Sequence, residues 1–453
     1  MRFSSEPWWR KCSAVLRYMP EQDRKTIAEI SAELPETAAA GYQAIQITAP
    51  YCSAGFHAWW GLCPYDYFSV NSALGGTIED FTALVDECHR HGLHVILFIN
   101  IGYGDITSPL WQTACSNRRK GHPGKEDALF LWSKTDQAPL PKRETPYFLH
   151  GGSWQWSSDA EEFYYGFWQV NDLREPMFDW QSPAFHAYVR DILGYWLSTG
   201  ADGFIIDAPN WYLNGSFPVL RRCITNVIHR HPGVMCIPEG GAGYGDSFVP
   251  WLTEAGFDML EDQTFESDLH WNGSAVMNAL RLESPALLDN ALAVCRAARA
   301  MGSACWSYTG WGDAWTPERR LLEIAILLAS GHMTEIIPSH LLGFLPEHHE
   351  ILHRILRMTK YEAVAPCNER IRLFTVAPES CYAFLCPSDE TPVLCVFNLS
   401  EMPREMWLSI SENSLPEVSG WYDAAAQRLL NIGADCLYFS LPACGFALAV
   451  PIA

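Results

Sequence analysis

Residues 200–211 (GADGFIIDAPNW) constrain the fold most strongly, because a short apolar run within them ends abruptly on a carboxylate. The run 204–206 is rich in β-branched residues and follows a glycine, which is typical of a strand buried in a parallel sheet. Asp207 stands where this strand is expected to end. Residues 233–239 (GVMCIPE) repeat the pattern and end on Glu239. Two successive strands are therefore expected to carry one acid each at their carboxyl ends.

Predicted strands and helices alternate along most of the chain. Short apolar runs predict strands at 12–18, 44–48, 94–99, 204–206, 233–238, 258–260, 304–308 and 332–337. Apolar residues at helical spacing predict helices at 26–40, 78–91, 219–231, 285–301, 317–330 and 347–361. This alternation indicates an α/β fold with a parallel sheet, and the number of strands fits a closed (β/α)8 TIM barrel. Since the carboxyl ends of barrel strands surround one open mouth, Asp207 and Glu239 are expected to face the same site.

Two segments depart from the alternation. Residues 103–176 form a long insertion after the third strand, rich in Gly, Pro, Trp and Tyr, and loops of that length in a compact domain are usually functional. From residue 366 the pattern changes to short alternating runs, which are typical of antiparallel strands. The predicted organisation is a barrel at 1–102 and 177–365, an inserted subdomain at 103–176 and a C-terminal β-sandwich domain at 366–453.

The amino-acid composition excludes some classes of binding partner and cofactor. The chain has 31 basic and 52 acidic residues, for a net charge of −21, which argues against nucleic acid or an anionic membrane as a partner. Its 15 cysteines form no CxxC pair and no zinc-site spacing with histidine, so reduced thiols and no metal or other cofactor are expected. The amino terminus lacks an apolar signal segment, and no run of apolar residues is long enough to span a bilayer. A cytoplasmic protein is the default expectation, and the pattern does not indicate an oligomeric state.

Paired carboxylates across a small gap are the groups that glycosidic bond cleavage requires. One must stay ionised to attack the anomeric carbon, and the other must supply a proton to the leaving oxygen. A single aspartate at a strand end more often caps the following loop, but the repetition in successive strands favours a catalytic pair. The 19 tryptophans suit stacking against sugar rings, although many of them are expected to fill the core.

The residues around Asp207 resemble a known family. Residues 202–208 (DGFIIDA) are similar to the Gly-Phe-Arg-Ile-Asp-Ala motif of the α-amylase superfamily, glycoside hydrolase family 13. Residues 149–156 (LHGGSWQW) and 178–183 (FDWQSP) resemble its α-glucosidase branch. The resemblance implies a barrel with these two additions and a small-molecule carbohydrate substrate. It also implies that Asp207 is the nucleophile and that Glu239 is the general acid, then the base.

The chain departs from the family pattern at the expected sugar-binding floor. The arginine that the family places two residues before the nucleophile is Ile205 here. Loss of a close cation raises the pKa of a buried carboxylate by roughly 1 to 3 units, so Asp207 is expected to be harder to ionise unless another cation, from the protein or the substrate, compensates.

Other family positions are also replaced. The family's Asp, Asn and His after the third strand fall on Phe98, Gly102 and Tyr103, and the Tyr-Asp that would face the terminal sugar falls on Leu62 and Cys63. The His-Asp pair of the seventh strand is absent, and Asp313 is the first acid available to fill its role. The acidic spacing of a calcium loop near residue 22 is also missing, so no calcium site is expected there.

Four aromatic residues are candidates for contact with the sugar, although packing against the insertion or the barrel is the alternative for each: Trp60, Tyr103, Trp211 and Trp311. Two functions remain open. The first is a retaining α-glycoside hydrolase or transglycosylase that acts on a small or modified α-glycoside through an atypical minus-one subsite. The second is a non-catalytic amylase-like protein that binds a carbohydrate or a protein partner.

Overall fold

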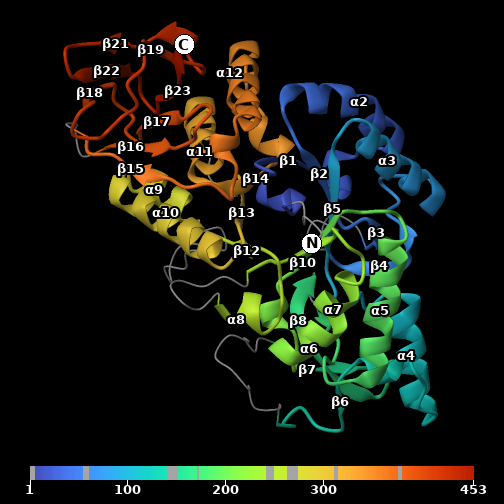
Figure 1. The fold of residues 1–453 in the computed structure, drawn as a ribbon. Coiled ribbons are helices and arrows are strands. Elements are labelled where there is room, and N and C mark those ends of the chain that lie inside the picture. Colours follow the sequence, from blue (N-terminus) through green and yellow to red (C-terminus); the bar gives the residue numbers. More distant parts are fainter. Residues whose placement is uncertain are drawn as a thin grey trace, which may run out of the picture. The chain divides into compact units, whose positions relative to one another are not determined.

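The computed structural model describes residues 6–54, 61–139, 152–170, 173–240, 249–262, 274–310, 315–375 and 380–452 (Figure 1). Its central sheet has eight strands in the order β11-β10-β5-β2-β1-β14-β13-β12. These are β1 (Ala14–Tyr18), β2 (Ala44–Thr48), β5 (His94–Ile99), β10 (Gly203–Ile206), β11 (Met235–Pro238), β12 (Leu260–Glu261), β13 (Cys305–Tyr308) and β14 (His332–Ile336). Each strand overlaps a segment predicted from the sequence, although β12 shares only residue 260 with its predicted strand, and the predicted TIM barrel is confirmed.

The positions of apolar residues in each strand and helix follow from which of its faces are buried. All four residues of β10 are buried, as expected for a parallel strand that is covered on both sides. Helix α3 (Ile78–Arg90) begins at Thr77, whose hydroxyl accepts the Asp80 N–H in a capping box. The helix buries one stripe of apolar side chains at helical spacing, namely Phe81, Leu84, Val85 and Cys88.

The other predicted helices are also present, as α2 (Ile27–Ala40), α10 (Pro285–Ala300), α11 (Pro317–Ser330) and α12 (Pro346–Leu356). The segment predicted at 219–231 is divided into α6 (Phe217–Leu220), a π-helical turn η4 (Arg221–Thr225) and α7 (Asn226–Ile228). The π turn was not predicted, because periodicity alone does not reveal a one-residue insertion in a helix. Within the described ranges, none of the helices combines the length and apolar character that crossing a bilayer requires.

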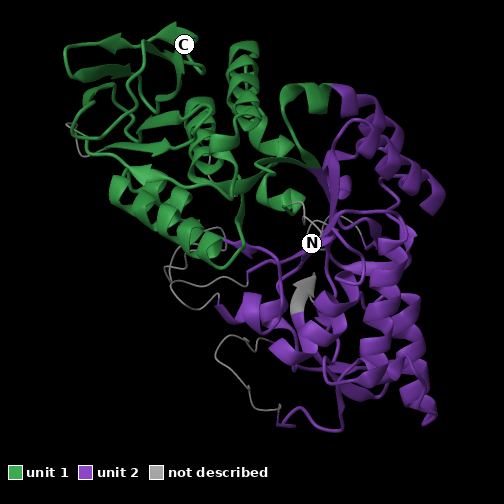
Figure 2. Cartoon of the chain, in the orientation of Figure 1, with its two compact units in different colours: residues 1–16, 36–44, 262–453 green, residues 17–35, 45–261 purple. Residues whose placement is uncertain are grey.

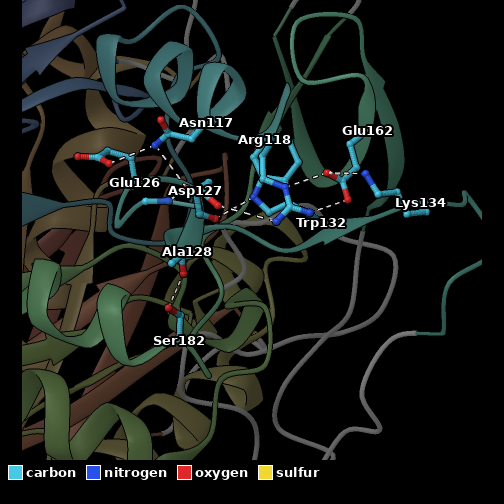
Figure 3. Close-up of polar contacts among 10 residues, drawn as sticks. Asn117, Arg118, Glu126, Asp127, Ala128, Trp132, Lys134, Glu162 and Ser182 are labelled. Carbon is cyan, nitrogen blue, oxygen red and sulfur yellow. Dashed lines mark hydrogen bonds and ion pairs between the residues drawn. The ribbon is translucent and has the colours of Figure 1, made fainter. Parts of the chain in front are cut away.

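The insertion contains helix α4 (Pro109–Lys120) and an antiparallel sheet of β6 (Trp132–Ser133), β7 (Ser153–Ser157), β8 (Glu162–Val170) and β9 (Leu173–Pro176). Arg118 links α4 to this sheet (Figure 3). Its Nη2 lies 2.6 Å from Glu162 Oε1, and its guanidinium lies over the Trp132 ring at 5.5 Å from the ring centre. The insertion therefore has its own charged and aromatic contacts.

The C-terminal region folds into two antiparallel sheets, in the orders β15-β16-β17-β23-β19-β20 and β18-β22-β21. Their strands are β15 (Ile371–Arg372), β16 (Cys381–Cys386), β17 (Val393–Asn398), β18 (Arg404–Ser409), β19 (Gly420–Asp423), β20 (Arg428–Leu429), β21 (Asn431–Ile432), β22 (Cys436–Leu441) and β23 (Phe446–Ile452). Successive β16 side chains serve different cores. Ala383 and Leu385 pack with the second sheet, whereas Tyr382 and Phe384 pack with α11 and α12.

Contacts within the chain form two compact units (Figure 2). One consists of residues 1–16, 36–44 and 262–453, and the other of residues 17–35 and 45–261. The second unit contains the strand ends that carry Asp207 and Glu239. The domain boundaries at 103, 177 and 366 stay predictions.

Candidate active site

Asp207 and Glu239 leave two neighbouring strands at the same level. Strands β10 and β11 pair in parallel, with Ile206 opposite Pro238, so the next residue of each strand is an acid. The Asp207 N–H donates to the Ile99 carbonyl and the Glu239 N–H donates to the Ile206 carbonyl, both at 2.9 Å. These bonds continue the sheet ladder and fix where the two side chains begin.

The Glu239 carboxyl lies near enough to Asp207 to oppose the ionisation of that residue. Glu239 Oε2 also accepts the backbone N–H of Ala208 at 3.2 Å. Ala208 has a φ of 38° and a ψ of 51°, which is left-handed backbone that residues other than glycine rarely adopt. Such strain persists where surrounding contacts hold it, and it often marks functional sites. Here it turns the chain immediately after Asp207 and aims the Ala208 N–H at Glu239.

Burial raises the pKa of Asp207 well above its ordinary value, and the neighbouring Glu239 carboxyl raises it further. Glu261, on β12, adds to this effect, and Arg17 opposes it. A buried carboxyl beside a second carboxyl is costly to ionise. Asp207 therefore holds its proton more tightly than an exposed aspartate does.

Three buried tyrosines surround Asp207: Tyr51, Tyr103 and Tyr212. Burial raises the pKa of each hydroxyl well above its usual range, and the Asp207 charge adds to the shift. All three are therefore neutral hydroxyls near the carboxyl pair. Only Tyr103 was predicted from the sequence. Tyr51 lies just beyond the second barrel strand, and Tyr212 lies a few residues beyond the fourth. Their positions after strand ends are the sequence feature from which both could have been predicted.

Two replaced family positions lie side by side. Phe98 on β5 is the register partner of Ile205 on β10, and both side chains are fully buried. The guanidinium of Arg17, on β1, lies 4.8 Å from the centre of the Phe98 ring, and its Nε–H donates to Thr48 Oγ1 at 2.9 Å. The sequence prediction missed Arg17. Its one signal was a basic residue inside an otherwise apolar strand.

A third replaced position, Gly102, is in close contact with Tyr212. A Cβ atom at Gly102 would lie 2.7 Å from Tyr212 Cε1, which is closer than van der Waals packing allows. The Gly102 N–H donates to Asn100 Oδ1 at 2.7 Å. The loss of the family's asparagine at this position is therefore coupled to the tyrosine that takes up its space.

The predicted aromatic contacts have different outcomes. The Trp211 ring stacks on Phe167 of β8, with 4.9 Å between ring centres and 23° between planes. Tyr103 packs in a cluster with Cys63, Tyr165, Met177 and Leu213. Trp60, Trp311 and Asp313 lie outside the described residues. The structure thus brings Asp207, Glu239 and Tyr103 together, and it shows one face of Trp211 covered by a side chain of the insertion.

Among the described residues, Cys63, Asp105 and Glu175 have the spacing to hold a cation, with their ligand atoms within 4.8 Å of one another. All three are buried. Cys63 Sγ lies 3.6 Å from Asp105 Oδ2, and Glu175 Oε2 accepts the Ile106 N–H at 2.9 Å. Burial and the nearby Asp105 raise the pKa of Glu175 to about 8. Glu175 therefore holds its proton to higher pH than an exposed glutamate does.

Residues 41–235 match the family model for the catalytic domain of alpha amylase. A probable alpha-glucosidase of Rhizobium meliloti is 25% identical over 218 residues, which are 46% of this chain and 37% of that relative. The trehalose synthase/amylase TreS of Mycobacterium tuberculosis is 27% identical over 143 residues, which are 32% of this chain and 22% of that relative. The aligned part thus spans well under half the length of these curated relatives.

Solved structures are similar over nearly the whole chain. The alpha-glucosyl transfer enzyme XgtA has a TM-score of 0.72 at 16% identity, with coverage of 99% of this chain and 100% of that chain. The alpha-amylase from H. orenii has a TM-score of 0.73 at 16% identity, with coverage of 98% and 100%. At this level of identity the likeness is one of fold, and it agrees with the barrel, its insertion and the C-terminal sheets.

Proposed function

Because residues 41–235 match the family model for the alpha-amylase catalytic domain, we propose that the chain is a retaining α-glycoside hydrolase or transglycosylase. Its substrate would be a small or modified α-glycoside that binds in an atypical minus-one subsite. The observation that carries the proposal is that Asp207 and Glu239 directly follow register partners at the ends of two paired barrel strands, where the Glu239 carboxyl raises the pKa of Asp207. A retaining mechanism uses two carboxyls at about 5 Å from each other once the substrate is bound.

In this mechanism Asp207 attacks the anomeric carbon and forms a covalent glycosyl ester, while Glu239 gives its proton to the departing glycosidic oxygen. Glu239, now ionised, then takes a proton from water or from the hydroxyl of an acceptor sugar. That oxygen attacks the anomeric carbon, the ester bond breaks, and Asp207 leaves as a carboxylate. Water gives hydrolysis, and an acceptor sugar gives transglycosylation. Asp313 is the proposed third acid, in the place of the family's seventh-strand aspartate.

The proposal of an atypical subsite is supported by the residues at the positions where the family contacts the terminal sugar. Phe98, Ile205 and Cys63 are each fully buried, and none of them offers the charged or amide groups that hold the hydroxyls of an unmodified terminal glucose. Tyr103 and Trp211 are the described aromatic candidates for sugar contact, and Trp60 and Trp311 are proposed with them. A pocket with this chemistry favours a donor that has lost, or has modified, some of its hydroxyl groups.

The second candidate is a non-catalytic amylase-like binding protein. The raised pKa of Asp207 favours it, because a protonated aspartate does not attack an anomeric carbon. The replaced family positions also favour this second function. A protein that only binds a sugar or a protein partner does not need the residues that the family carries at those positions.

A panel of activated aryl α-glycosides distinguishes the two functions. We expect release of the aryl group, and we expect Asp207→Ala to lower kcat by roughly a thousandfold or more, since nucleophile and acid act as a unit. The matched control is Asp202→Asn, at the start of the same strand, whose carboxylate accepts the Val95 N–H at 2.8 Å. This variant is expected to retain activity in proportion to its folded fraction. If no α- or β-linked donor reacts while oligosaccharide binds equally to wild type and Asp207→Ala, the binding function is correct.

A further inference from the structure

We propose that Arg17 supplies, from the first barrel strand, the positive charge that the family carries two residues before the nucleophile. The inference rests on the proposed function, because it assigns Asp207 the role of nucleophile. Arg17 would act as a positioning residue: it does not touch the substrate but sets the charge of the carboxylate that does.

The arrangement of the strands brings Arg17 to the right place. The order β10-β5-β2-β1 separates Arg17 from Asp207 by two intervening strands. The side chain extends past β2 to β5, since its guanidinium lies over the ring of Phe98. Phe98 stands directly beside Ile205 in the register of β5 and β10. The guanidinium therefore lies over the neighbour of the position at which the family places its own arginine.

Two contacts hold the guanidinium there. The Phe98 ring attracts it through a cation–π interaction, and Thr48 Oγ1 accepts its Nε–H at 2.9 Å. Gln46 Nε2 in turn donates to Thr48 Oγ1 at 3.1 Å. A phenyl ring at 98 is what permits this arrangement, because the family's aspartate at that position would instead form an ion pair with a nearby arginine.

The positive charge of Arg17 acts on the ionisation of Asp207. Asp207 faces Glu239 at the end of β11, Glu261 on β12, and the neutral hydroxyls of Tyr51, Tyr103 and Tyr212. Glu239 and Glu261 oppose ionisation of Asp207, and Arg17 favours it. Arg17 is only 5% exposed, so salt screens its effect on Asp207 much less than it screens a surface charge.

The test compares Arg17→Met with Arg17→Lys, which keeps the charge. The acidic limb of the pH profile of kcat/KM reports ionisation of the nucleophile in the free enzyme. Removal of a nearby cation raises a carboxyl pKa, so Arg17→Met is expected to move this limb to higher pH by roughly 1 unit or more. Arg17→Lys is expected to restore most of the wild-type profile.

The matched control is Arg118→Met, which removes a half-buried arginine and its ion pair with Glu162 in the insertion (Figure 3). It is expected to leave the acidic limb in place. Thr48→Val is a milder second variant, since it keeps the Arg17 charge and removes the hydroxyl that bonds Arg17 and Gln46, and a smaller shift in the same direction is expected from it. This variant keeps the test decisive if Arg17→Met does not fold.

A second readout is independent of turnover. The titration of the Asp207 carboxyl is measured by difference infrared spectroscopy, with Asp207→Asn as the blank. We expect the titration midpoint to rise in folded Arg17→Met and to return toward wild type in Arg17→Lys. An unchanged midpoint in folded Arg17→Met would overturn the inference. If no donor reacts but the midpoint still moves, the proposed function has failed while the electrostatic role of Arg17 stands.

Discussion

Glu175 is a buried carboxyl whose ionisation its surroundings oppose. Its pKa is raised from 4.5 to about 8, first by burial and then by the charge of Asp105. A carboxyl with a raised pKa in the folded state holds its proton more tightly there than in the unfolded chain. Stability is therefore expected to fall as the pH rises from about 4.5 to about 8, and then to level off.

Glu175→Gln is expected to remove this pH dependence, because a neutral amide resembles the protonated acid and does not ionise. The free energy of unfolding of the variant should exceed that of wild type by a margin that grows between pH 5 and pH 9, to several kcal/mol by the relation of about 1.4 kcal/mol per pKa unit. Urea denaturation at both pH values measures the margin. The control is Glu161→Gln, whose side chain is 59% exposed in an ion pair with Arg119. A margin for Glu175→Gln that does not change with pH would contradict this account.

At the scale of single residues, the sequence predicted Asp207 and Glu239 because each directly follows a strand that is recognisable by composition. Arg17 and Tyr212 could not be predicted in the same way. Their proximity to Asp207 depends on how the strands are ordered across the sheet and on which way long side chains turn, and neither property is local in the sequence. The cluster of Cys63, Asp105 and Glu175 likewise joins distant segments.

Two glycines differ in how closely other residues pack against them. Gly102 follows β5, and the Tyr212 ring lies against its Cα. Gly194 lies within helix α5 (Pro183–Leu197), is exposed, and has no atom within 4 Å of where a Cβ would be. The same substitution is thus expected to have opposite effects at the two positions.

Gly102→Ala is expected to lower the free energy of unfolding by about 1–3 kcal/mol, since the added methyl group must displace the Tyr212 ring. Gly194→Ala is expected to raise it by about 0.5–1 kcal/mol, because alanine loses less conformational entropy than glycine in a helix. Chemical denaturation of both variants gives the comparison. Equal effects of the two substitutions would mean that the contact between Gly102 and Tyr212 does not exist in solution.

At the scale of elements, periodicity identified every barrel strand and most helices, since burial on one or both faces leaves a clear pattern. It did not reveal the π turn η4, which changes the helix without changing which residues are apolar. The strands of the insertion were also not predicted individually. Two of them, β6 and β9, have only two and four residues, and β7 lacks a regular alternation of buried and exposed positions.

Within the unit that contains residues 262–453, one core joins barrel helices to the C-terminal sheet. Side chains of α11 and α12 pack with Tyr382, Phe384, Cys395 and Phe397. Arg370 adds polar contacts, as its guanidinium donates to the carbonyls of Ala329, Val364 and Ala365. The predicted C-terminal domain at 366–453 therefore covers apolar helix surface.

A fragment that ends at residue 365 is expected not to fold. Each large apolar side chain that it leaves exposed costs about 1.5–3 kcal/mol, and a few of them exceed the roughly 5–15 kcal/mol by which a protein is stabilised. Solubility on expression, near-ultraviolet circular dichroism and binding of a hydrophobic dye are the measurements. A soluble, monomeric fragment with the melting temperature of the full chain would show that the shared core is dispensable.

The relation of Arg17 to Phe98 and Ile205 has a consequence for how active members of such families are recognised. A search that scores position 205 alone counts this chain as having lost its arginine, and hence its chemistry. The strands of a barrel converge, so a positive charge on one strand can act on a carboxylate at the end of another. Surveys of catalytic competence should therefore compare which side chains lie near the active site in three dimensions, rather than which residue occupies each aligned position.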